Sequence, residues 1–160
     1  MQINMTKANR KIILIRIIFF LLIIVHFSII FRFSNQNGED SGELSRKVTI
    51  FVLDILGQDE KIIEQEQIEN IEHIIRKLAH FSIYMILGIL LMGLMCTYKT
   101  KNIKRLFISM FVGILYASLD EFHQSFTPGR TALVTDVLID TVGVIIGTIM
   151  ICGAITIWKK

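Results

Sequence analysis

Four long apolar stretches constrain the fold of this chain more than any other feature of its sequence. A helix needs about 20 mostly apolar residues to cross the hydrocarbon core of a bilayer. Residues 12–31, 78–98 and 133–158 form stretches of at least that length, and residues 106–119 form a shorter one. Charged residues make up 19% of the chain, less than the roughly 25% typical of soluble domains. The sequence therefore predicts an all-α integral membrane protein with four transmembrane helices.

The shorter stretch must extend beyond its apolar residues if it is to cross the membrane. Its 14 residues would reach only about 21 Å as a helix, against a hydrocarbon core of about 30 Å. We therefore expect a helix over residues 106–124. This extension carries Asp120, Glu121, His123 and Gln124 into the membrane.

The first stretch is expected to be a retained membrane anchor. Basic residues precede it, as they precede the apolar part of a signal peptide. However, the apolar run is longer than that part usually is, and it ends in Phe31-Arg32-Phe33, which offers no small residues for cleavage.

The distribution of charge predicts the orientation of the chain. Lysines and arginines in the segments 7–11, 99–105 and 159–160 all fall on one side of the predicted bundle, and these segments contain no Asp or Glu. Positive charge in short segments is typical of the cytoplasmic side. We therefore expect a multi-pass protein of the cell membrane with both termini in the cytoplasm. Residues 32–77 would then lie outside, with ten of the chain's fourteen acidic residues.

This outer segment shows two helical patterns. One apolar stripe ends before Gly57 and consists of Leu44, Val48, Phe51, Val52 and Ile55. A second stripe runs into the second transmembrane helix and consists of Ile68, Ile71, Ile74, Ile75 and Leu78. This spacing predicts short amphipathic helices that lie on the membrane surface or cap the bundle, with mobile loops as the alternative.

The polar residues of the apolar stretches are expected to meet at the outer side of the bundle. Arg76, His80 and Tyr84 are spaced to share one helical face, and Asp136 and Asp140 lie one turn apart on the fourth helix. An ionised group in hydrocarbon costs about 2.5 to 3.5 kcal/mol, so such groups should face inward and pair. We expect the cations to neutralise the acids there, although a network that only fixes helix packing is the alternative.

The predicted binding site gathers the polar residues of all three outer helix ends and of the turn at residues 127–130. Its members are Arg76, Lys77, His80, Tyr84, Asp120, Glu121, Gln124, Arg130, Asp136 and Asp140.

These residue types are compatible with several kinds of chemistry. If the site is catalytic, the candidates for acid–base work are Asp120, Glu121, His123 and His80. A zinc site would draw on His80, Glu121, His123, Asp136 and Asp140, but their spacing is not diagnostic and the neighbouring cations would compete with a metal. We expect neither a metal ion nor another cofactor. Nucleic acid is excluded as a partner because no basic run is interleaved with aromatic residues.

Three blocks of the sequence resemble VanZ-like membrane proteins. They are FSNQNGEDSGELS at residues 33–45, RKLAHFSIY at 76–84, and YASLDEFHQSFTPGRTALVTDVLIDTVGVIIG at 116–147. The resemblance implies a four-helix membrane protein, often of Gram-positive bacteria, whose founding member is linked to low-level resistance to teicoplanin but not to vancomycin. It also implies that a recurrent set of polar positions is occupied here by His80, Asp120, Glu121, Gln124, Arg130, Asp136 and Asp140.

Three functional hypotheses follow. The leading one is an envelope protein whose outer-leaflet site binds a membrane lipid, a lipid-linked envelope component or a lipoglycopeptide, and so contributes to teicoplanin-type resistance or to envelope maintenance. The second is an enzyme that modifies a lipid-linked envelope precursor by carboxylate and histidine acid–base chemistry. The third is a transporter or a scaffold. Transport is disfavoured because the charge lies near one membrane face and the two halves of the chain are no obvious inverted repeat.

Overall fold

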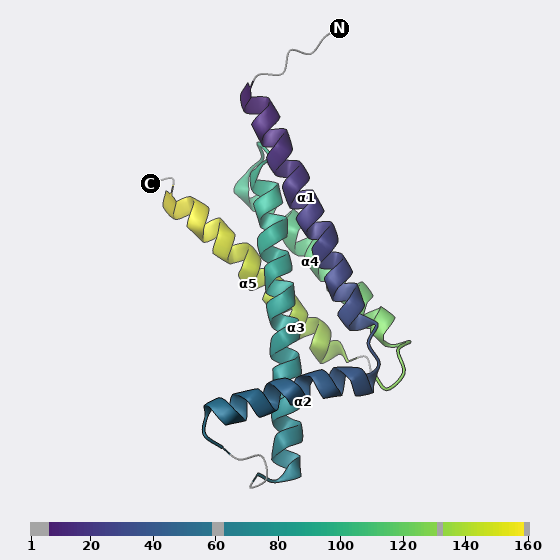
Figure 1. The fold of residues 1–160 in the computed structure, drawn as a ribbon. Helices are drawn as coiled ribbons and strands as arrows, with labels where there is room; N and C mark the ends of the chain where they lie inside the picture. The colour runs from purple at the N-terminus through teal and green to yellow at the C-terminus, as the bar shows by residue number, and fades with distance from the viewer. Residues whose placement is uncertain (1–6, 59–62, 131–132, 159–160) are drawn as a thin grey trace.

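The computed structural model describes residues 7–58, 63–130 and 133–158, which form five helices (Figure 1). The helices are α1 (Lys7–Ser34), α2 (Gly38–Ile55), α3 (Gln65–Cys96), α4 (Asn102–Gln124) and α5 (Val134–Trp158). Helices α1, α3, α4 and α5 are long and apolar enough to cross a membrane. The prediction of an all-α membrane protein with four transmembrane helices and a short helical segment between the first two is confirmed.

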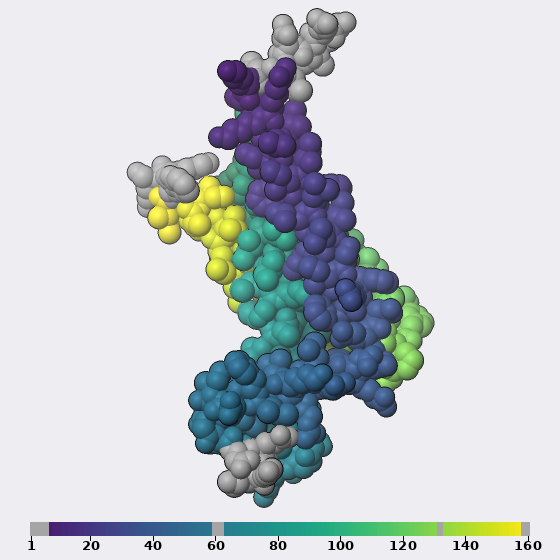
Figure 2. Space-filling model, in the orientation of Figure 1, coloured from purple at the N-terminus to yellow at the C-terminus, as the bar shows by residue number. Residues whose placement is uncertain are grey.

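The surface of the bundle is apolar, as a protein in contact with lipid requires. Leu14, Phe20 and Phe111 are 58%, 59% and 68% exposed. Continuous exposed patches of this kind are rare on soluble monomers. α1 lies along the outside of the bundle in the space-filling view and contributes much of this surface (Figure 2).

Glycines bring α3 and α5 into close contact where the two helices cross. A Cβ atom at Gly147 would collide with the backbone carbonyl of Met85, and one at Gly143 would meet that of Phe81. Gly88 of α3 has the reciprocal relation to the carbonyl of Val144. Gly143 and Gly147 form a GxxxG pair, the spacing that lets membrane helices pack backbone against backbone. From this crossing the two helices diverge in both directions (Figure 1).

Polar contacts hold α1 to the bundle, and Arg16 and His26 of α1 take part in them with their own side chains. Near its first residues, the Arg16 guanidinium donates to the hydroxyl and the carbonyl of Thr97 at 3.1 and 2.9 Å. Near the middle, Nε2 of His26 lies 2.8 Å from the carbonyl oxygen of Ile83. Both side chains are therefore satisfied within the bundle, and neither belongs to the polar site at its other end.

α2 crosses α3 at the end of the bundle opposite to the first residues of α1 (Figure 1). Its start is set by Asn37, whose side chain accepts a hydrogen bond from the amide of Asp40 at 2.7 Å. Gly57 follows its end with a φ of +68°, a conformation that glycine adopts without strain.

The apolar stripe predicted for this helix is largely exposed, with Phe51 at 64% and Ile55 at 68%. The face of α2 that is buried instead carries Ser41, Ser45, Thr49 and Leu53. Three small polar side chains and Leu53 thus face the bundle, while Phe51 and Ile55 of the apolar stripe point away from it.

The second pattern of the outer segment is not a separate helix. It forms the first turns of α3, which has 32 residues and is therefore about 48 Å long. A helix of this length projects beyond a hydrocarbon core of about 30 Å. The position of Arg76, Lys77 and His80 on a single rigid element follows from this continuity.

Candidate functional site

The candidate site lies where the turn between α4 and α5 meets the corner between α1 and α2. The amide of Gly38 donates to the carbonyl of Pro128 at 3.1 Å, and a Cβ atom on Gly38 would collide with the carbonyl of Gly129. Gly129 has a φ of +74°, so the turn itself depends on glycine. Segments more than 90 residues apart in the sequence are joined at this corner.

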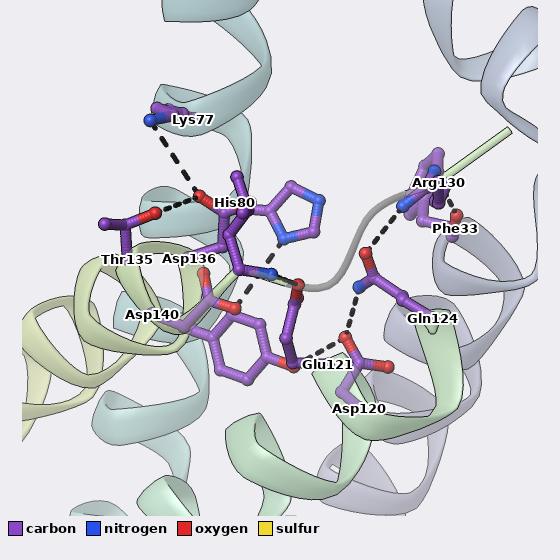
Figure 3. Close-up of polar contacts among 12 residues, drawn as sticks. Phe33, Lys77, His80, Asp120, Glu121, Gln124, Arg130, Thr135, Asp136 and Asp140 are labelled. Carbon is purple, nitrogen blue, oxygen red and sulfur yellow. Dashed lines mark hydrogen bonds and ion pairs between the residues drawn. The ribbon is translucent and has the colours of Figure 1, made fainter. Parts of the chain in front are cut away.

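A chain of hydrogen bonds runs from this turn into the bundle (Figure 3). Arg130 donates to the side-chain oxygen of Gln124 at 2.9 Å, and the Gln124 amide donates to Oδ2 of Asp120 at 2.9 Å. The hydroxyl of Tyr84 donates to the same Asp120 oxygen at 2.8 Å. Tyr84 is fully buried, while Asp120 and Gln124 are 6% and 5% exposed. This series of hydrogen bonds therefore links α3, α4 and the turn in a buried region with little water, where hydrogen bonds are strong.

Glu121 links α4 to the start of α5. Its Oε1 accepts a hydrogen bond from the backbone amide of Leu133 at 2.9 Å, directly before the first residue of α5. Amides at a helix start lack partners within the helix, and a carboxylate there is favoured by the helix dipole. We therefore assign Glu121 a role in positioning α5.

Two pairs of a basic and an acidic side chain connect α3 with α5. Nδ1 of His80 lies 3.7 Å from Oδ2 of Asp140, and Nζ of Lys77 lies 3.9 Å from Oδ1 of Asp136. Both distances are too long for hydrogen bonds. The Asp140 side chain is 1% exposed, and neither of its oxygens has a hydrogen-bond partner among the described residues. A buried carboxyl group without a donor is costly, which makes Asp140 the most unusual group of the site.

A cavity of about 200 Å³, here called the polar cavity, opens between these pairs and the turn. Its lining is mostly charged or polar, and comes from α3, the end of α4, the turn and α5. The lining polar side chains are His73, Arg76, Lys77, His80, Gln124, Arg130, Asp136 and Asp140.

A second cavity of about 190 Å³, here called the apolar groove, lies between α1, α2 and α3. Its apolar lining comprises Ile30, Phe33, Leu44, Val48, Ile75, Ala79 and Ile83. Three residues, Arg76, His80 and Arg130, line both cavities. The two spaces therefore adjoin, one polar and one apolar, with a cationic boundary between them.

The family model for VanZ/LLP1 matches residues 19–157. The chain belongs to the VanZ/LLP1 family. This membership associates a membrane protein of this kind with glycopeptide resistance. The comparison with curated proteins finds no match, and the comparison with solved structures finds none either.

The three blocks that resemble VanZ-like proteins meet at this site. The first supplies the α1–α2 corner, the second a part of α3 beside α2, and the third the end of α4 and most of α5. Of the ten residues predicted to bind a ligand in this VanZ/LLP1 chain, seven line the polar cavity: Arg76, Lys77, His80, Gln124, Arg130, Asp136 and Asp140. Asp120 lines the apolar groove, while Tyr84 and Glu121 line neither cavity and hold their neighbours in place.

The pairing of charges differs from the expectation that cations neutralise each acid. Asp120 receives its hydrogen bonds from a tyrosine hydroxyl and a glutamine amide, and Glu121 receives one from a backbone amide. The reason is local: Gln124 lies one turn beyond Asp120 on α4 and stands between it and Arg130.

One predicted candidate lies apart from the others. The ring of His123 packs against Phe31 of α1, with 5.1 Å between ring centroids, and His123 lines neither cavity. Within the described part of the chain, no three His, Cys, Asp or Glu side chains are placed to hold a metal ion together.

Two features of the site were not predicted from the sequence: His73 in the polar cavity, and the small polar face of α2 that borders the apolar groove. His73, Lys77 and His80 follow one another at helical spacing, and so do Ser41, Ser45 and Thr49. This spacing indicates that each set shares one helical face, but the apolar stripes on the same helices are the stronger pattern.

Proposed function

We propose that the site of this VanZ/LLP1 protein binds an amphipathic component of the bacterial envelope, and that this binding contributes to teicoplanin-type glycopeptide resistance or to envelope maintenance. The component would be a lipid, a glycolipid or an acylated glycopeptide. The observation that carries the proposal is the adjoining pair of cavities, which share Arg76, His80 and Arg130. A ligand with a polar head and an apolar chain matches the two linings at once.

The basic segments support the orientation that this function needs. The ends of α1 and α5 that carry flanking lysines and arginines lie at the opposite end of the bundle from α2 and the site (Figure 1). With those segments in the cytoplasm, the site lies at the outer leaflet. Teicoplanin carries an acyl chain and partitions into membranes, whereas vancomycin does not, so an outer-leaflet site would act selectively on teicoplanin.

Drug susceptibility tests this proposal. A susceptible Gram-positive host would express the wild type, Asp140→Asn, or Asp54→Asn at matched protein levels. Asp54 is an exposed acid of α2 that lines neither cavity, so it serves as the control. We expect the wild type and the control to raise the inhibitory concentration of teicoplanin but not that of vancomycin, and Asp140→Asn to lose this effect. Equal protection by Asp140→Asn would contradict a role for the site.

A second candidate function is an enzyme that modifies a lipid-linked precursor. The observation in its favour is His80, which faces both cavities and has the buried carboxyl group of Asp140 3.7 Å from its Nδ1. An acid behind a histidine can orient the ring for proton transfer to a ligand on its other side. Mass spectrometry of envelope lipids from cells with and without the protein tests this candidate, and unchanged lipids would exclude it.

A further inference from the structure

The boundary between the two cavities contains two arginines that form no ion pair with an acid of the described residues. Among the described residues, neither Arg76 nor Arg130 has a carboxylate oxygen within ion-pair distance. Arg130 donates to two neutral acceptors, the Gln124 side chain at 2.9 Å and the Phe33 carbonyl at 3.1 Å. Arg76 reaches only the Ser45 hydroxyl, at 3.4 Å, and its buried Nε has no hydrogen-bond partner in the part of the chain that is described.

The two guanidinium groups also repel each other. Burial lowers the pKa of Arg130 below its ordinary value and the positive charge of Arg76 lowers it further, while the charges of Asp120 and Glu121 offset only part of this shift. Two like charges at one partly buried boundary are unfavourable unless an anion lies between them. An arginine pair is particularly suited to phosphate, whose oxygens accept parallel hydrogen bonds from the planar guanidinium group.

The acids of the polar cavity do not occupy this position. Asp136 and Asp140 lie on α5, where they face Lys77 and His80. Their wall of the cavity therefore suits a hydrogen-bond donor rather than an anion. Both oxygens of Asp140 lack a donor, and a hydroxyl group of a ligand would supply one.

We propose that Arg76 and Arg130 bind the phosphate of a phosphodiester lipid, with its acyl chains in the apolar groove and a hydroxylated head group in the polar cavity. This inference rests on the proposed function, because it names the ligand class for the same site. Phosphate lies at the junction of such a lipid, as the two arginines lie at the junction of the two cavities.

Three probes separate the sources of binding energy. Binding to the full chain, purified in a neutral detergent, would be measured for dioctanoyl phosphatidylglycerol, for dioctanoylglycerol and for inorganic phosphate. The first carries the chains, the phosphate and two hydroxyl groups, the second lacks the phosphate, and the third lacks the chains. We expect phosphatidylglycerol to bind at least about tenfold more tightly than either of the other two, because charge-assisted hydrogen bonds and burial of the chains add.

Variants of Arg76 test the role of the pair. Arg76→Gln should weaken phosphatidylglycerol binding by about tenfold or more, and Arg76→Lys should weaken it less, because lysine keeps the charge but not the planar fork. Arg32→Gln is the matched control, since Arg32 is an exposed arginine of α1 that lines neither cavity. Thermal unfolding in the same detergent checks that each variant is folded.

The outcomes distinguish this inference from the proposed function. Tight binding of phosphatidylglycerol that depends on Arg76 supports both. Equal binding of dioctanoylglycerol, unaffected by Arg76→Gln, overturns the phosphate site but leaves an amphipathic ligand in place. Equal binding of inorganic phosphate that depends on Arg76 retains the anion site but overturns the lipid. Binding of none of the three probes overturns the lipid-phosphate inference, and the susceptibility experiment then decides the proposed function alone.

Discussion

α3 and α5 meet in two different ways along their length. Where they cross, Gly88, Gly143 and Gly147 allow backbone to touch backbone. Toward the end of the bundle that carries α2 the same helices diverge, and the side chains of Lys77 and His80 face Asp136 and Asp140 beside the polar cavity. The crossing leaves no room for a ligand, whereas this end has a space of about 200 Å³.

The two regions therefore have different roles: the crossing holds the helices together, and the diverging ends form the cavity. Close packing at the crossing fixes the angle between the helices, and this angle sets the width of the cavity. Among the described residues, the buried hydroxyl of Thr148 at the crossing and both carboxylate oxygens of Asp140, one turn away from Gly143, lack hydrogen-bond partners. Asp140 differs from Thr148 because it also lines the polar cavity, where a ligand can reach it.

Adding a methyl group at the crossing should have the largest effect on stability. In Gly147→Ala the new Cβ atom would collide with the carbonyl oxygen of Met85, and a backbone atom has little freedom to move away. We expect a loss of about 3 kcal/mol in the free energy of unfolding. Gly153→Ala is the control, since nothing lies within 4 Å of a Cβ atom there. Thermal unfolding in detergent would contradict the comparison if both variants unfolded at the same temperature.

Removing a hydroxyl from the hydrogen-bond chain should have the next largest effect. Tyr84→Phe leaves Asp120 without one of its two donors in a fully buried setting, and we expect a loss of about 2 kcal/mol. Tyr116→Phe removes a bond of 3.0 Å to the neutral carbonyl of Phe27 and should cost about 1 kcal/mol. The two variants would be compared by the same unfolding measurement. A larger loss for Tyr116→Phe would mean that the chain through Asp120 contributes little to stability.

The sequence was sufficient to predict the parts of the fold that depend on local pattern. Apolar length predicted the four transmembrane helices. The polar residues were predicted to gather at one end because ionised groups in lipid must meet one another. Each of these inferences needs only the spacing of residues along one helix and the cost of charge in hydrocarbon.

The details of the site depend on contacts between distant segments and could not be predicted in the same way. The sequence does not show that Gln124 stands between Arg130 and Asp120, because this depends on how the turn docks on the α1–α2 corner. The face of α2 turned to α3 was also not evident. An apolar stripe serves a protein core and a membrane surface equally well, so Phe51 alone cannot indicate which of them it faces.

The two buried aspartates should respond differently to the loss of charge. Oδ2 of Asp120 accepts two hydrogen bonds, whereas the side-chain oxygens of Asp140 accept none from the described residues. Asp140→Asn removes the attraction to His80. This loss is offset because burying a neutral amide costs less than burying a carboxylate. We therefore expect Asp140→Asn to change the free energy of unfolding by less than about 1 kcal/mol. A clear loss of stability would mean that Asp140 supports the fold rather than a ligand.

Charge on the exposed side of α2 should matter least, which sharpens the contrast with the charge at the cavity. Nζ of Lys47 lies 2.8 Å from Oε1 of Glu43, and this hydrogen bond holds the pKa of Glu43 below its ordinary value. A carboxyl group with a lowered pKa stabilises the fold above its unfolded pKa, and this contribution disappears as the pH falls through the folded value. Because both side chains are about 70% exposed, water and salt screen the pair. In Lys47→Ala, an NMR titration should show the pKa of Glu43 returning upward, with no measurable change in unfolding temperature at neutral pH. A fall as large as that expected for Tyr84→Phe would mean that exposed pairs on α2 stabilise the protein as strongly as the buried chain does.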